Sequence, residues 1–230
     1  MLILCCDTSN STCCAGLYED GSELGFRLNN SGRTHSETFM PIVDEVIKAS
    51  GKEYKDIDAI AVTTGPGSFT GIRIGLSAVK GLALALNIPC IPVSSTKALA
   101  VSVEVVAAPS KDSILVPCFD ARNNRVFASV LTADSMEILV EEGAYDADEL
   151  VSRMKEENLF EAKTIILLGN GADTMQKALA KEDINAENAG GAAILPKGIL
   201  KASEGIEPIS GAAVKAVYCA VSSAERLKKS

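Results

Sequence analysis

A repeat in the order of predicted elements constrains the fold of this chain more than any other feature. Residues 2–6 and 12–18 form two strand-like runs, and an aspartate follows the first run. Residues 113–119 and 125–131 repeat this arrangement, again with an aspartate after the first run. In both halves, segments with alternating helical and strand-like patterns follow. The repeat predicts two related α/β lobes and excludes a single doubly wound sheet.

A glycine-rich loop, residues 64–70, separates a predicted strand from a helical pattern that continues to Leu86. Gly65 and Gly67 allow unusual backbone angles and close backbone approach. Ser68 or Thr70 can cap the helix, whose positive end attracts anions. The loop lacks both the G-x-G-x-x-G spacing and a G-K-[ST] sequence, so neither nucleotide fingerprint applies. From these residues alone, the loop either binds an anion or is a tight turn packed against another element.

The two aspartates that end the first strand of each half, Asp7 and Asp120, form a second candidate site. Carboxylates at two such turns could face one cleft and hold a metal–nucleotide complex, as in a two-lobed phosphotransferase. They could also simply close their turns. Ser9 stands where such a phosphotransferase favours glycine, which argues against a nucleotide. The predicted nucleotide or anion cleft consists of Asp7, Gly65, Gly67, Ser68 and Asp120.

Composition excludes several classes of function. The 22 basic and 30 acidic side chains give a net charge of −8, the wrong sign for a domain that neutralises nucleic-acid phosphates. One histidine, His35, and no C-x-x-C pair leave no common zinc site. Ser68 is not in a G-x-S-x-G elbow, so a serine triad with His35 is not supported. We expect no catalytic and no metal-binding residues.

Seven cysteines, an odd number with two adjacent pairs, do not form a disulfide framework and favour a reducing compartment. The first residues, MLILCCDTSN, read as a strand and lack the basic region and cleavage site of a signal peptide. No uninterrupted apolar run reaches the roughly 18 residues of a membrane span. We therefore expect a cytoplasmic protein that does not bind a membrane.

Four segments carry a resemblance to a known family. They are LILCCDTSNSTCCAGLYEDG, HSETFMPIVDEVI, TTGPGSFTGIRIGLSAVKGLA and FDARNNRVFA. Together they resemble the TsaB (YeaZ) family of tRNA threonylcarbamoyladenosine biosynthesis, which belongs to the M22 glycoprotease-like proteins. GPGSFTGIRIG is the most specific of these motifs. The resemblance is close over residues 1 to about 130 and loose after Gly169-Asn170-Gly171.

The resemblance implies a two-lobed actin-like (ribonuclease H-like, ASKHA) α/β fold, with a mixed β-sheet and flanking helices in each lobe. We place the N-terminal lobe at residues 1–106 and the C-terminal lobe at 107–207. A helix within residues 208–230 is expected to pack back on the first lobe, after a linker-like stretch at 188–198.

The resemblance also implies a non-catalytic scaffold subunit that pairs with the catalytic paralogue TsaD and the ATPase TsaE. TsaD binds its metal through histidines, and this chain has only His35, so it cannot carry that site. We expect a homodimer in isolation, only indirect contact with tRNA and no cofactor, although ATP or ADP could lie in the cleft or at a partner interface. Two alternatives stay open: a glycoprotease-like peptidase and an actin-fold ATP-dependent phosphotransferase.

Residue chemistry and family together predict a docking surface on the helices at 34–50 and 70–86, because each carries a long apolar stripe. The predicted interface residues are His35, Phe39, Ile42, Val46, Ile72, Leu76 and Val79.

Overall fold

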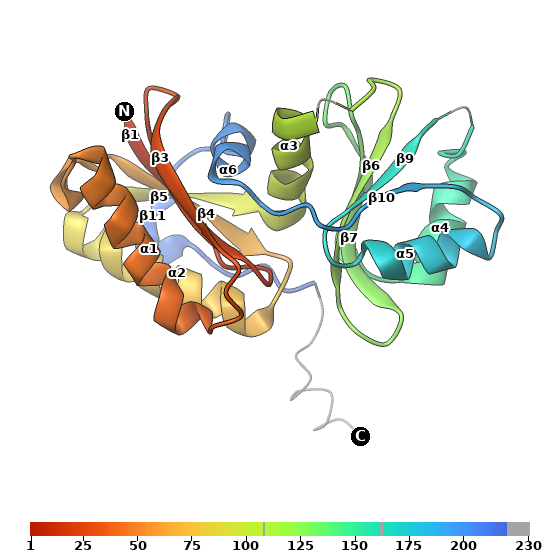
Figure 1. Ribbon diagram of the computed structural model, residues 1–230, viewed down its shortest axis with the longest axis horizontal. Coiled ribbons are helices and arrows are strands. Elements are labelled where there is room, and N and C mark those ends of the chain that lie inside the picture. The colour runs from red at the N-terminus through yellow and green to blue at the C-terminus, as the bar shows by residue number, and fades with distance from the viewer. Residues whose placement is uncertain (108, 162, 220–230) are drawn as a thin grey trace.

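A computed structural model describes residues 1–107, 109–161 and 163–219, and it has two β-sheets side by side (Figure 1). The first sheet has the strand order β11-β5-β4-β1-β2-β3. Its strands are β1 (Leu2–Asp7), β2 (Cys13–Glu19), β3 (Ser22–Asn29), β4 (Ala59–Gly65), β5 (Pro89–Ser94) and β11 (Ile209–Ser210). The second sheet has the order β10-β9-β6-β7-β8. Its strands are β6 (Ile114–Asp120), β7 (Arg125–Thr132), β8 (Ile138–Asp146), β9 (Ile165–Leu168) and β10 (Glu187–Ala189).

The two sheets repeat one topology, as the sequence predicts. In the first, β1, β2 and β3 pair antiparallel, and β4 and β5 extend the sheet in parallel from β1. In the second, β6, β7 and β8 pair antiparallel, and β9 and β10 extend it in parallel from β6. The predicted two-lobed α/β fold with mixed sheets is therefore confirmed.

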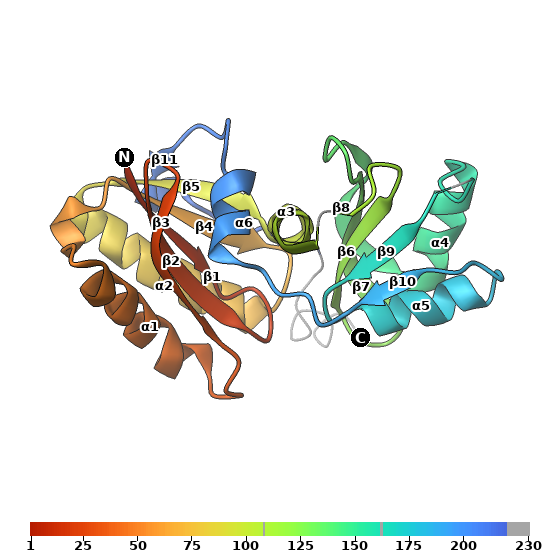
Figure 2. The same cartoon turned by 45° about the horizontal axis from the view of Figure 1, so that its top comes forward.

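The helices cover the sheets in three layers. Helices α1 (His35–Ser50) and α2 (Phe69–Leu86) pack on one face of the first sheet, and α4 (Ala147–Glu156) and α5 (Ala172–Ala180) pack on the second. Helices α3 (Ser95–Ala107) and α6 (Pro196–Ala202) lie between the two sheets, as Figures 1 and 2 both show. One hydrophobic cluster joins the lobes there, because Leu99 of α3 packs with Ile3 of β1 and Phe119 of β6.

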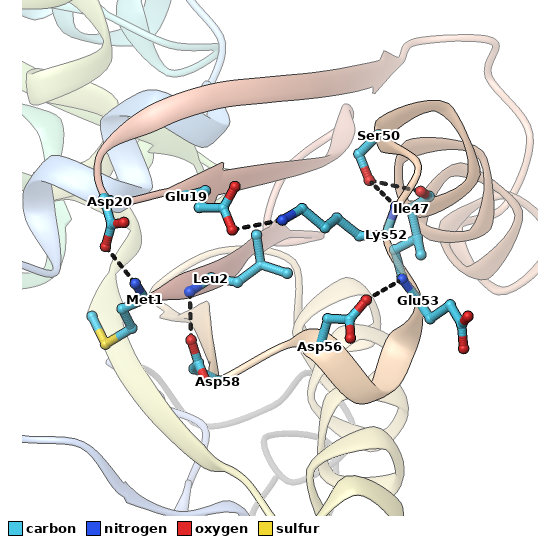
Figure 3. Close-up of polar contacts among 10 residues, drawn as sticks. All are labelled: Met1, Leu2, Glu19, Asp20, Ile47, Ser50, Lys52, Glu53, Asp56 and Asp58. Carbon is cyan, nitrogen blue, oxygen red and sulfur yellow. Dashed lines mark hydrogen bonds and ion pairs between the residues drawn. The ribbon is translucent and has the colours of Figure 1, made fainter.

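Polar contacts hold the outer end of β1 in place (Figure 3). The terminal amine of Met1 pairs with Asp20, and the amide of Leu2 donates to the Asp58 carboxylate at 2.6 Å. Lys52, just after α1, donates to Glu19 of β2 at 2.6 Å. Asp20 and Gly21 have φ values of 48° and 81°, the left-handed values that an Asp-Gly hairpin turn favours.

The chain returns to the first lobe differently from the predicted terminal helix. In residues 208–219, the structure has the two-residue strand β11, which pairs antiparallel with β5, and the 3-10 turn η2 (Gly211–Ala213). An extended segment follows to Cys219, so the helix prediction is wrong for these residues. The rest of the predicted helix, residues 220–230, lies outside the described residues. The chain already packs on the first lobe at α6. This helix overlaps the end of the stretch predicted to be a linker, residues 188–198, and continues beyond it.

One described helix, α2, is long and apolar enough by length and composition to span a membrane, with a mean hydropathy of 1.4. In the structure α2 packs on the first sheet, and Ile72, Leu76 and Val79 are buried there. Six of its 18 residues are buried, and Leu84 near its end is 83% exposed.

Candidate functional site: a cavity between the lobes and a groove between two helices

A cavity of about 730 Å³ lies where the carboxyl ends of β1, β4 and β6 meet. Segments far apart in the sequence form its wall: the turn after β1, the glycine loop, the start of α1, the tip of the β6–β7 hairpin, and residues 217–219. Of the five residues predicted to form a cleft, Gly67, Ser68 and Asp120 line this cavity, whereas Asp7 and Gly65 do not. Both lobes therefore contribute to one site.

The glycine loop packs tightly against the turn that follows β1. A Cβ at Gly67 would lie 2.2 Å from the carbonyl oxygen of Ser9, and a Cβ at Gly71 would lie 2.2 Å from that of Thr8. The Ser68 amide donates to the Ser9 carbonyl at 2.7 Å, and the Thr8 hydroxyl donates to the Gly71 carbonyl at 2.8 Å. These close backbone contacts explain why glycine is needed at both positions, and no ligand has to be invoked. They agree with the interpretation of the loop as a tight turn packed against another element.

Ser68 caps α2, as the sequence allows. Its hydroxyl oxygen accepts a hydrogen bond from the Gly71 amide at 3.1 Å. The Ser68 hydroxyl, a candidate group for binding an anion, therefore accepts from a backbone amide that would otherwise lack a partner at the start of the helix.

Asp7 is buried beneath the turn and does not reach the cavity wall. Its Oδ1 accepts from the Ser9 amide at 3.0 Å, from the Ser9 hydroxyl at 2.6 Å and from the Thr63 hydroxyl at 2.5 Å. Its Oδ2 is buried without a hydrogen-bond partner. Burial raises the pKa of Asp7 because an ionised carboxylate loses its hydration there, although the Ser9 and Thr63 bonds oppose the shift. In this arrangement Asp7 stabilises its own turn.

Asp120, by contrast, is exposed at the cavity wall at the end of β6. Its carboxylate accepts from the Arg122 amide at 2.9 Å, and its own amide donates to the Asn170 side chain at 3.1 Å. Arg122, Asn123 and Asn124 at the hairpin tip all have positive φ values, of 62°, 53° and 59°. The tip thus presents Asp120 and Arg122 to the cavity in a fixed, unusual backbone conformation.

His35 is half-buried at the first turn of α1 and borders the cavity. Its Nε2 lies 2.6 Å from the carbonyl oxygen of Asn10 and joins α1 to the turn after β1. A hydrogen bond with the Cys13 thiol raises the pKa of His35, and the Asn10 carbonyl and Asp7 add to the shift while burial opposes it. Among the described residues no hydrogen bond joins His35 to Ser68, whose hydroxyl caps α2 instead.

A second depression, a groove of about 510 Å³, runs between α1 and α2 on the outside of the first lobe. It is lined by His35, Ser36, Phe39, Met40, Phe69, Thr70, Arg73, Ile74, Ser77 and Ala78.

The predicted interface residues need a correction. Six of them lie in the core between the helices and the first sheet, with exposures of 7% or less: Phe39, Ile42, Val46, Ile72, Leu76 and Val79. Only His35 and the edge of Phe39 border the groove. The apolar periodicity marks the face of each helix that packs on the sheet. The neighbouring face, which the sequence analysis did not select, forms the groove.

Sequence analysis also missed the segment after η2, which lies across the glycine loop. The Val217 amide donates to the Thr64 carbonyl at 2.8 Å, and a Cβ at Gly65 would lie 2.5 Å from the Val217 carbonyl oxygen. We call residues 214–219 the strap. Its Tyr218 packs on Phe69 with ring centroids 5.0 Å apart, between the cavity and the groove. Tyr218 is an aromatic residue in an otherwise helical pattern, and no sequence signal points to this contact.

The described residues offer little for covalent or metal chemistry. They contain no group of three or more His, Cys, Asp or Glu side chains that could hold a metal ion. Six of the seven cysteines are buried, and burial raises the pKa of five of these thiols: Cys5, Cys6, Cys14, Cys90 and Cys118. Cys219 of the strap is half-buried, with a pKa raised to about 11 by burial. Thiols of this kind are poor nucleophiles.

Comparison with known families places the chain. The model of the family described as "TsaD: tRNA N6-adenosine threonylcarbamoyltransferase" matches residues 25–228. The chain belongs to this family. Several proteins named TsaB align with it over 100 to 176 residues, so the resemblance seen in the sequence is confirmed.

The tRNA threonylcarbamoyladenosine biosynthesis protein TsaB of Haemophilus influenzae is 28% identical over 71% of this chain and 72% of its own length. The TsaB proteins of Escherichia coli and Bacillus subtilis are 38% and 34% identical, over 44% and 56% of this chain. These two alignments span 43% and 55% of the relatives' own lengths. A solved structure, YeaZ from Pseudomonas aeruginosa, superposes with a TM-score of 0.78 at 22% identity, over 94% of this chain and 99% of that one. This likeness shows that the two share a fold.

Proposed function

We propose that the chain is a non-catalytic scaffold subunit required for the threonylcarbamoyladenosine modification of tRNA. Its family and the names of its TsaB relatives support a place in this pathway. In this proposal it pairs with a TsaD-type threonylcarbamoyltransferase and a TsaE-type ATPase, contacts tRNA only through them, and works in the cytoplasm. Without its partners it forms a homodimer through the same surface.

The groove between α1 and α2 is the observation that carries this proposal. Half of the groove lining is apolar and comes from both helices: Phe39, Met40, Phe69, Ile74 and Ala78. Leu84 of α2 is 83% exposed. A hollow between two helices with apolar side chains in its lining is a surface that a partner protein can cover.

Three observations support the absence of catalysis. The chain has a single histidine, which bonds to a backbone carbonyl. Asp7 is buried and away from the cavity wall, and the glycine loop is packed against the turn at Thr8 and Ser9. We therefore expect neither peptide cleavage nor ATP turnover by the isolated chain. In the complex, ATP or ADP would lie in the cavity beside Ser68 and Asp120; titration calorimetry with ADP, for the chain alone and with its partners, tests this.

Reconstitution of the modification tests the proposed function. The reaction contains the TsaD-type and TsaE-type proteins of the same organism, tRNA, and this chain or one of its variants. Modification is expected only when this chain is present. Ile74→Asp and Ser77→Arg, which place charge in the groove, should abolish both modification and copurification with the TsaD-type protein.

The matched control is Ile138→Asp, at an apolar residue that is 49% exposed on β8, away from the groove. This variant should support full modification. Equal activity with and without the chain, or intrinsic ATP turnover by the chain alone, would contradict the scaffold role.

A further inference from the structure

Arg73 lies at the groove in an orientation that two aromatic rings and a hydrogen bond hold. Its guanidinium carbon is 3.7 Å from the ring centroid of Phe69 and 5.5 Å from that of Tyr218. Its Nε donates to the Tyr218 hydroxyl at 2.9 Å. Arg73 is exposed, and no carboxylate of the described residues lies within 4.0 Å of it. The contacts with Tyr218 and Phe69 hold Arg73 without neutralising its charge, and they leave its other N–H donors available to a ligand.

The only ionisable side chains that line the groove are basic. Of its lining residues, only Arg73 and His35 can be positive, and none is acidic, although the chain carries a net charge of −8. The rest of the lining is apolar or small and uncharged, with Met40, Ile74 and Ala78 along the two helices. Such a surface fits an apolar helix of a partner, laid between α1 and α2, that also carries negative charge.

We propose that Arg73 determines the specificity of this groove by pairing with an aspartate or glutamate on the apolar helix of a partner protein, and that Tyr218 of the strap is its positioning residue. This inference rests on the proposed function, because it names the chemistry of the partner at the same groove. A planar guanidinium held over Phe69 presents its remaining N–H donors as a fork that matches a carboxylate.

A protein carboxylate fits better than an RNA phosphate. A surface that binds phosphates gathers several cations, whereas here one arginine and one half-buried histidine border a mainly uncharged groove. Contact of Arg73 with tRNA is the competing outcome that the experiment separates.

The test measures the affinity between the full-length chain and the purified TsaD-type protein at low and high salt. Arg73→Ala should weaken binding by about tenfold to a hundredfold at low salt and by less at high salt. Arg73→Lys keeps the charge but loses the planar fork, so it should restore binding only in part. Tyr218→Phe, which removes only the hydroxyl, should weaken binding by about threefold in the wild-type background and not at all together with Arg73→Ala. This lack of additivity distinguishes a positioning role from a merely structural one.

Each outcome decides a different point. If Ile74→Asp abolishes binding while Arg73→Ala binds as the wild type does, the proposed docking surface stands and the role of Arg73 is wrong. If Ile74→Asp and Ser77→Arg both bind normally, the docking surface itself is wrong. If Arg73→Ala reduces retention of tRNA by the free chain without changing protein affinity, the cation serves a nucleic acid and the inference is overturned. Circular dichroism confirms folding of every variant.

Discussion

At the scale of single residues, the surroundings of two glycines in α2 differ sharply. A Cβ at Gly71 would lie 2.2 Å from the Thr8 carbonyl oxygen, whereas a Cβ at Gly81 would meet nothing within 4 Å. We predict that Gly71→Ala lowers the free energy of unfolding by roughly 2 kcal/mol or more, because backbone atoms must move apart. Gly81→Ala should raise it by up to about 1 kcal/mol through helix propensity. Urea denaturation of both variants measures the difference, and equal stabilities would contradict the packing of the loop on Thr8.

Asp7 gives a pH-dependent prediction at the same scale. Its pKa is raised from 3.8 by burial, so between that value and the raised pKa the folded chain binds more protons than the unfolded chain. Protonated Asp7 therefore stabilises the fold, and this contribution is lost as pH rises through the raised pKa. We predict that the wild type loses stability relative to Asp7→Asn as pH increases from about 3.8. Urea denaturation of both proteins over a pH series measures this, and a constant difference would show that Asp7 titrates normally.

At the scale of elements, the N-terminus of α2 depends on one side chain. The Ser68 hydroxyl accepts from the Gly71 amide at 3.1 Å. Ser68→Ala should lower the free energy of unfolding by about 1 kcal/mol, because the capping hydrogen bond is lost. Ser68→Asp should remain nearly as stable as the wild type, because a carboxylate also caps the helix and interacts favourably with its positive end. Thermal unfolding of the two variants checks this. If both lose the same stability, the capping bond does not contribute.

The elements that were predicted correctly from the sequence are those in which periodicity and turn residues match the conformation that the packed structure adopts. The helix expected at 34–50 is α1, which Gly51 ends with a φ of 71°. The glycine loop was correctly placed between β4 and α2. Helix α6 escaped prediction because it has seven residues with a glycine inside, and Gly198 is needed there because a Cβ would lie 2.0 Å from the Ser102 hydroxyl. The strap was predicted as a helix because its contacts with Thr64 and Arg73 are tertiary, and these override local propensity.

The candidate site was predicted less well than the fold, for a related reason. Periodicity reports which helix face is apolar, and in α1 and α2 that face packs on the chain's own sheet. The groove face contains Thr70, Arg73 and Ser77, whose residue types do not distinguish a docking surface from solvent-exposed helix. Likewise, Asp7 and Asp120 occupy matching places in the repeat, but only the structure shows that one is buried and the other exposed. Exposure arises from tertiary packing, within a lobe as well as between lobes, which no single element encodes.

At the scale of the whole molecule, the lobes are joined by one hydrophobic cluster and by a polar contact at its edge. Glu142 of β8 accepts hydrogen bonds from the hydroxyls of Ser94 and Thr96, which lie at the junction of β5 and α3. Burial raises the pKa of Glu142 from 4.5, and the two hydroxyls oppose the shift. Cys219 of the strap lies near enough for the Glu142 charge to raise its pKa. No lysine or arginine of the described residues forms an ion pair with Glu142.

This contact predicts that the opening of the lobes depends on pH. Separation would return Glu142 to water and lower its pKa, so the closed form binds more protons than the open form between about 4.5 and the raised pKa. Closure is therefore favoured at low pH and weakens as pH rises through that interval. A pair of spin labels, one on each lobe, should report a longer mean distance at the higher pH. In Glu142→Gln, which stays neutral and can still accept from both hydroxyls, the distance should not change with pH. A pH-dependent distance that persists in Glu142→Gln would assign the opening to another group.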